Sequence, residues 1–148
     1  TGATGATGAT GPAGPQGERG YNDGIYAYGG VSAVSNGENV PLTLSQSTTP
    51  TVMSVSDNAV SVPAGTYLVS YTVNTSSDTS NILRVALAVN GSVLQTEEIL
   101  VSAGNGELET LSKTIILTVG DTTTLSIVNT TEGEISVTNA GLAVVKLQ

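Results

Sequence analysis

The chain of 148 residues contains no cysteine, histidine, tryptophan or phenylalanine. The absence of cysteine excludes disulfides and thiolate ligands, and without histidine there is no imidazole to act as a base or to bind a transition metal. Positive charge is scarce too, since four Lys and Arg stand against twelve Asp and Glu and give a net charge of −8. This balance argues against nucleic acid and anionic membrane surfaces as partners.

Catalytic chemistry is not indicated by the residues that remain. Ser and Thr are abundant, but no His is present to activate one as a nucleophile. Lys113 could serve as a base, although a lysine in a strand more often points outward and blunts a sheet edge. We therefore predict that the chain is not an enzyme and that it needs no cofactor.

The acidic residues gather around expected loops. They could supply oxygen ligands for Ca²⁺, or they could be solvated side chains that keep the surface soluble, and the sequence leaves both interpretations open. No run approaches 18 apolar residues, so no membrane span is predicted. The carboxylates concerned are Glu97, Glu98, Glu107, Glu109, Glu132 and Glu134.

Glycine recurs at every third position of the N-terminal segment, until Asp23 occupies the next place in that frame. Such a period is typical of a collagen triple helix, in which only glycine fits at the axis where three chains meet. A flexible Gly/Ala/Thr linker is the alternative interpretation. We predict a collagen-like tract over residues 1–22, the end of a longer stalk, and a separate head over residues 23–148. The repeat glycines are Gly2, Gly5, Gly8, Gly11, Gly14, Gly17 and Gly20.

The rest of the chain has the pattern of short β-strands. Apolar residues alternate with polar ones over 66–75 and 82–89, and Asn90-Gly91 after the second run is a strong hairpin signal. Further strands are expected over 108–119, 122–129 and 135–148, and we count eight to ten strands with no convincing helix. The pattern predicts an all-β sandwich or jelly roll and leaves its topology open.

Several expected strands carry apolar residues on both faces, as in "TIILTV" (114–119) and "GLAVVKL" (141–147). A strand of a sandwich needs only one buried face, so the second apolar face favours burial between subunits. The alternative is a monomer whose strands are simply rich in β-branched residues.

Four segments in the second half resemble the jelly-roll heads of tumour-necrosis-factor-type and complement-type proteins. They are "PAGTYLVSYTV" (63–73), "VALAVNGSVLQ" (85–95), "TIILTVGDTTTLSIVN" (114–129) and "AGLAVVKL" (140–147). This resemblance implies a TNF-like, complement-head-like jelly-roll sandwich that is homotrimeric and follows a short triple-helical segment. It also implies that the closing strand runs through the centre of the trimer, with Leu142, Val144, Val145 and Leu147 as candidate axis residues.

A narrower resemblance is to the Bacillus collagen-like exosporium glycoprotein family (BclA), with its clostridial spore-surface relatives. The GAT triplets, "GIYAYGGVSAV" (24–34) and the small-residue core without phenylalanine carry this resemblance. It implies a structural glycoprotein of the bacterial spore surface, whose head trimerises, aligns the stalk and forms the outermost tip.

The same family resemblance implies several partners and one modification. The partners would be two further copies of the chain, other spore-coat or exosporium proteins, and host surface ligands that aid adhesion. Thr4, Thr7 and Thr10 occupy outward positions of their triplets and would carry O-linked sugars, unless threonine is simply tolerated there. The alternative function is the receptor- or ligand-binding tip of a collagen-stalked phage fibre or secreted bacterial adhesin.

Overall fold

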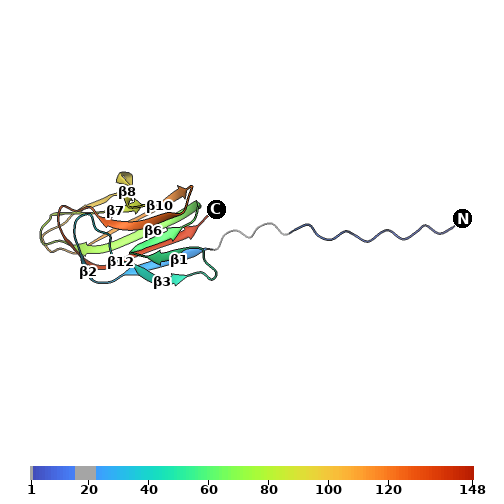
Figure 1. The fold of residues 1–148 in the computed structure, drawn as a ribbon, viewed down its shortest axis with the longest axis horizontal. Helices are drawn as coiled ribbons and strands as arrows, with labels where there is room; N and C mark the ends of the chain where they lie inside the picture. The colour runs from blue at the N-terminus through green and yellow to red at the C-terminus, as the bar shows by residue number, and fades with distance from the viewer. Residues whose placement is uncertain (1, 16–22) are drawn as a thin grey trace.

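In a computed structural model of the protein, residues 2–15 and 23–148 are described, and Figure 1 shows their arrangement. Residues 2–15 form neither helix nor strand and are exposed, Thr4, Thr7 and Thr10 among them. Gly17, Gly20 and the predicted boundary after residue 22 lie outside the described residues. The described repeat glycines, Gly2 to Gly14, have open space where a Cβ would be. A triple helix needs two more chains to fill that space and stays a prediction.

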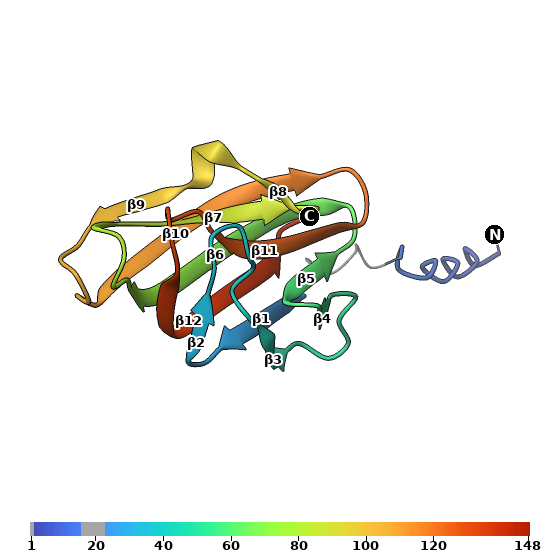
Figure 2. The ribbon, with the colours of Figure 1, turned by 60° about the vertical axis from the view of Figure 1, so that its left-hand side comes forward.

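The head consists of two antiparallel sheets, which Figure 2 shows stacked face to face. In the first sheet the strand order is β10-β6-β12-β1-β3, with the short β2 pairing to β12. Except for β1 and β3, strands next to each other along this order are far apart in the chain, and the sequence does not predict such pairings. The strands are β1 (Gly24–Gly29), β2 (Ser32–Val34), β3 (Thr43–Ser47), β6 (Gly65–Ser76), β10 (Glu109–Val119) and β12 (Ile135–Lys146).

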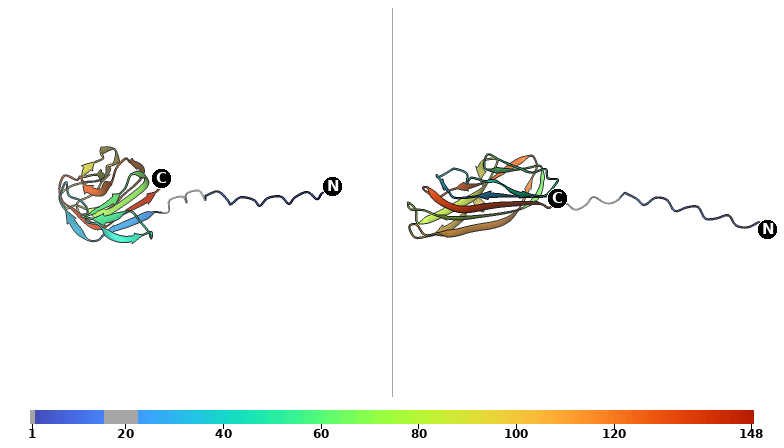
Figure 3. Two further views of the ribbon diagram at one scale, coloured as in Figure 1. Left: turned by 45° about the vertical axis from the view of Figure 1, so that its right-hand side comes forward. Right: turned by 90° about the horizontal axis from the view of Figure 1, so that it is seen from below.

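The second sheet has the order β4-β5-β11-β7-β8, with β9 pairing to β7. A short 3₁₀ helix, η1 (Gln95–Glu97), follows β8, and the described residues contain no helix with the length and apolar character needed to cross a bilayer. Figure 3 shows the strands of both sheets running along the length of the head. The strands are β4 (Ser54–Ser56), β5 (Ala59–Val62), β7 (Ile82–Val89), β8 (Ser92–Val93), β9 (Ile99–Ser102) and β11 (Thr123–Asn129).

The hydrophobic core lies between the sheets and follows the predicted alternation. In β6, Tyr67, Val69, Tyr71 and Val73 are all buried, while the residues between them face away from the core. The hydroxyl of Tyr71 donates a hydrogen bond to the backbone carbonyl of Glu97. Burial and the nearby Glu97 carboxylate raise the pKa of Tyr71 to about 12, so this donor stays protonated at neutral pH.

Two tight turns require left-handed backbone conformations. Asn90 and Gly91 join β7 to β8 with φ of 50° and 80°, which confirms the hairpin predicted from the Asn-Gly pair. The Asn90 side chain also accepts a hydrogen bond from the backbone N–H of Thr124 at 2.9 Å. Asp57 and Asn58, with φ of 49° and 60°, form a second such turn between β4 and β5, and the sequence had not indicated it.

Leu142 gives a direct test of this core. The side chain is fully buried in β12, so Leu142→Ala should lower the free energy of unfolding by about 2–5 kcal/mol. The same change at Leu108, which is 56% exposed, should change it by less than about 0.5 kcal/mol. Urea denaturation at one fixed protein concentration measures both. Equal losses for the two variants would contradict the placement of β12 in the core.

Candidate functional site

The outward side of the first sheet carries no charged side chain among the residues that the structure describes. Strand register and alternating burial place these residues on the side of the sheet that faces away from the core, and we call this side the neutral face. The chain has a net charge of −8, so a whole sheet face without any charged side chain distinguishes this side of the head from its other surfaces. Its residues are Tyr26, Tyr28, Thr43, Gln46, Thr66, Leu68, Ser70, Thr72, Asn74, Thr110, Ser112, Thr114, Ile116, Thr118, Asn139, Gly141, Ala143 and Val145.

Large apolar side chains on the neutral face are exposed. Strand register places Ile116, Leu68 and Val145 in one row across three strands. Ile116 is 67% exposed, Val145 42% and Leu68 38%, and the nearby Tyr26 and Tyr28 are also exposed. An exposed apolar patch of this kind, rimmed by polar groups, makes the neutral face a candidate interaction surface.

Seven polar side chains of the neutral face are hydrogen-bonded to one another across the strands. These bonds give partners without water to groups that dehydration would otherwise leave unpaired, which lowers the free-energy cost of dehydrating this surface. The pairs are Thr66 with Thr118 at 3.0 Å, Ser70 with Thr114 at 2.9 Å, Thr110 with Asn74 at 2.5 Å, and Asn74 with Asn139.

Tyr26 lies flat across the neighbouring strand, over Gly141. A Cβ added at Gly141 would come 2.5 Å from the Tyr26 hydroxyl oxygen and 2.9 Å from Cε2 of the ring. Gly141 is thus a site of close approach, by a side chain of the adjacent strand β1. Gly141 is not at a β-bulge, because the shift in register between β12 and β6 occurs between Val137 and Asn139.

A shallow hollow of about 300 Å³ opens beside Tyr26, and we call it the β1–β3 hollow. Tyr26 and Val145 border it on one side, and Gln46 and Thr48 border it on the other. The remaining lining residues are Gly24, Ile25, Ser47 and Ala143.

The four candidate axis residues, in β12 and just after it, form two pairs that differ in burial. Leu142 and Val144 are fully buried and point into the core of the sandwich. Val145 lies on the neutral face, and Leu147, just beyond the strand, is 45% exposed. The passage of this segment through a trimer axis stays a prediction, and only Val145 and Leu147 are placed where another chain could contact them.

Asp23, the residue that breaks the glycine repeat, anchors the first strand of the head. The carboxylate accepts hydrogen bonds from the Thr48 hydroxyl at 3.0 Å and from the Val52 backbone N–H at 3.2 Å. Burial opposes ionisation of Asp23. Hydrogen bonds from Thr51, Val52 and Thr48, together with the charge of Lys146, outweigh it and hold the pKa below its ordinary value.

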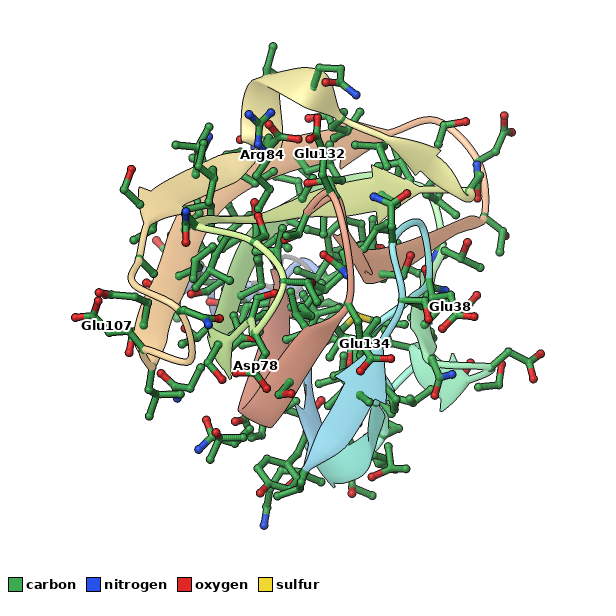
Figure 4. The ribbon with its side chains drawn as sticks, turned by 90° about the vertical axis from the view of Figure 1, so that its left-hand side faces the viewer. Glu38, Asp78, Arg84, Glu107, Glu132 and Glu134 are labelled. Atoms are coloured by element: carbon green, nitrogen blue, oxygen red, sulfur yellow. The ribbon has the colours of Figure 1, made fainter. Side chains whose placement is uncertain are left out.

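The charged residues that the structure describes lie away from the neutral face. Arg84 pairs with Glu98 at 3.5 Å and Lys113 with Glu97 at 3.0 Å, so two carboxylates considered for Ca²⁺ are engaged with cations. Figure 4 shows Glu38, Asp78, Glu107, Glu132 and Glu134 spread around one end of the head. Within residues 2–15 and 23–148, no three acidic side chains come together as a metal site would require.

Sequence reasoning missed Tyr26, Ile116 and Asp23. The signal for Ile116 was present in "TIILTV", because successive apolar residues in a strand must point to opposite faces. Tyr26 and Tyr28 alternate with the buried Ile25 and Ala27, which could have indicated an outward aromatic pair.

Comparison with known proteins identifies the fold. No protein-family model and no curated protein sequence matches the chain. Among solved structures, the chain is similar to the Eiger TNF of S. frugiperda, with a TM-score of 0.67 and 17% identity over 88% of this chain and 94% of that one. It is also similar to murine APRIL, with a TM-score of 0.65 and 13% identity over 85% and 99%. For the globular domain of zebrafish complement 1qA the TM-score is 0.62, with 9% identity over 85% and 98%.

These likenesses and the two antiparallel sheets show that the head has the jelly-roll fold of TNF and complement C1q heads. The all-β, TNF-like prediction made from the sequence is therefore confirmed. At such low identities the likeness concerns the fold alone.

The contact between Tyr26 and Gly141 can be tested by a double-mutant cycle. We expect Gly141→Ala to displace the Tyr26 ring and to lower the free energy of unfolding by about 1 kcal/mol, because the added methyl overlaps the ring. In a Tyr26→Ala background, Gly141→Ala should leave the free energy of unfolding unchanged, since the Tyr26 ring that the added methyl would overlap is absent. Thermal denaturation of the four chains measures the coupling. Additive effects would contradict the close contact.

The Asp23 anchor makes stability depend on pH in a defined direction. A carboxyl with a lowered folded pKa stabilises the protein fully above its ordinary value of 3.8 and loses this contribution as pH falls through the folded value. We expect Asp23→Asn to destabilise the head by about 1 kcal/mol at pH 7. The difference in the free energy of unfolding between Asp23→Asn and the unmodified chain should become smaller below about pH 4. Urea denaturation between pH 2.5 and 7 measures it, and a difference that is constant with pH would contradict the ionised anchor.

Proposed function

We propose that the chain is the head and adjoining stalk of a structural, collagen-like glycoprotein of the bacterial spore surface, and that three copies of the head associate through the neutral face. The observation that carries this proposal is the neutral face itself, which is uncharged, exposes large apolar side chains and has many of its polar side chains hydrogen-bonded to one another. The glycine repeat supports three as the number of copies, because a collagen helix contains three chains.

The function follows from the assembly. A tract with only Pro12 and Pro15 in seven triplets forms a weak triple helix by itself. A trimeric head would hold the three chain ends together at fixed register, so that the stalk can wind from that point. The acidic residues would remain on the outer surfaces of the trimer, where like charges are separated and solvated. The role is structural, and no catalytic step is part of it.

The family resemblance extends this proposal to location and partners. The head would form the outermost tip of the exosporium, next to other spore-coat or exosporium proteins, and would aid adhesion to surfaces or host ligands. Thr4, Thr7 and Thr10 are exposed and could be reached by a glycosyltransferase. Mass spectrometry of the tract isolated from spores would detect sugars at these threonines.

One observation favours the second candidate function, a ligand-binding tip of a phage fibre or adhesin. A cleft of about 520 Å³ lies between the segment around Gly37 and the turn at Asn58, and Glu38 and Asn39 contribute to its lining. Such polar groups suit a hydroxyl-rich ligand. Saturable binding of an oligosaccharide that Glu38→Ala abolishes would favour this function over a purely structural one.

The mass of the full chain in solution tests the structural proposal. Light scattering coupled to size exclusion should give three times the 14.8 kDa chain mass at micromolar concentration. Val145→Asp should reduce the mass to that of one chain, because it places three carboxylates on the surface to be buried. Leu100→Asp is the matched control and should leave the trimer intact, because Leu100 is an apolar residue of the second sheet that is 51% exposed, against 42% for Val145. A monomeric unmodified chain would overturn the proposal.

A further inference from the structure

Hydrogen bonds fix both walls of the cleft beside Glu38. The cleft has a volume of about 520 Å³ and lies between the segment that joins β2 to β3 and the turn from β4 to β5. The first wall is tied to β11, because the N–H groups of Gly37 and Val40 donate to β11 carbonyls at 2.8 and 2.7 Å. The Leu42 N–H donates to the Asn58 side-chain oxygen at 3.2 Å and ties this wall to the turn. A ligand therefore enters a preformed site, which lowers the entropic cost of binding.

Several polar groups of this cleft have no partner within the described residues. The Asn39 side chain makes no hydrogen bond there, and at Asn58 only the oxygen is engaged, which leaves the amide N–H groups free. Glu38 uses one carboxylate oxygen to accept from the Ser35 N–H at 3.3 Å and keeps the other one free. Two amides and one carboxylate thus offer both donors and acceptors to a ligand.

This set of groups matches the hydroxyl groups of a sugar. A hydroxyl both donates and accepts, so a carboxylate oxygen and an amide can bind two neighbouring hydroxyls at once. The described lining residues include no Lys or Arg, and the chain carries a net charge of −8, so an anionic ligand would be repelled beside Glu38. Within those residues no second carboxylate joins Glu38, so the site is not built around Ca²⁺.

The cleft is separate from the surface proposed for trimerisation. None of its lining residues belongs to the neutral face, so association through that face would leave the cleft open on every copy. Figure 4 shows Glu38 at one side of the end of the head, with Glu107 on the opposite side. Three clefts on one trimer would engage sugars of one surface together, which raises avidity by about 10²–10⁴ over a single site.

We infer that this cleft binds a neutral sugar residue of an oligosaccharide. The amides of Asn39 and Asn58 contact the hydroxyl groups of the sugar. Glu38 accepts a hydrogen bond from one hydroxyl and excludes sugars that carry negative charge. The inference rests on the ligand-binding candidate function and does not depend on the trimer, because every group of the site comes from one head.

A printed array of neutral oligosaccharides beside their sialylated and sulfated counterparts tests the class of ligand. The full chain is applied in buffer with EDTA, since no metal is required. We expect binding to neutral members and at least about tenfold weaker binding to their anionic counterparts, because the added charge would lie beside Glu38. Glu38→Gln keeps an acceptor oxygen and removes the charge, so it should remove most of this difference.

Asn39→Ala tests the place of binding. The Asn39 amide has no partner within the described residues, so this change should leave the melting temperature unchanged and weaken binding at least about tenfold. Asn105→Ala is the matched control and should change neither quantity. Asn105 is exposed in the loop between β9 and β10, and it too makes no side-chain hydrogen bond within the described residues.

The outcomes separate this inference from the function on which it rests. If neutral oligosaccharides bind and Asn39→Ala leaves their binding intact, the ligand-binding function stands and its assignment to this cleft is wrong. If the array shows no binding, or a preference for the anionic members, the neutral-sugar site is overturned. Neither result alters the mass that light scattering should give for the chain, so the structural proposal is judged independently.

Discussion

The glycine repeat places the strongest constraint on this molecule, because a residue at every third position can face the axis of a triple helix only if two other chains are present. A single copy of the tract has no internal contact that would hold it in shape, and the five described repeat glycines have open space where a side chain would begin. In the proposed function the head supplies what the tract lacks, since it would bring three chains together, in parallel and with their starting residues aligned.

The neutral face has the chemistry that such an association needs. Removing water from its apolar residues lowers the free energy, and many of its Ser, Thr and Asn side chains lose little on dehydration because they are bonded to one another. With a net charge of −8 on every copy, carboxylates at the contact would repel and would have to be dehydrated. Among the described residues, the acidic side chains lie on other surfaces, and five of them are spread around one end of the head.

Local pattern was sufficient to predict the strands and their buried faces. The alternation of Tyr67, Val69, Tyr71 and Val73 indicated which side of β6 is buried, and the Asn90-Gly91 pair indicated the hairpin. The sheet order was out of reach, since β12 lies between β1 and β6, whose sequences are far from it. For the candidate site, the sequence predicts less. Apolar residues on both faces of a strand suggest a second buried surface, but the sequence does not show which residues face the core and which face outward. The packed sandwich shows that Leu142 and Val144 face the core and that Val145 faces outward.

The edge strand β10, which pairs only with β6 among the described strands, limits which assemblies are compatible with the proposed stalk. Two free edges of this kind could pair with each other, but antiparallel pairing about a two-fold axis would point the two glycine tracts in opposite directions. A triple helix cannot form from such a dimer.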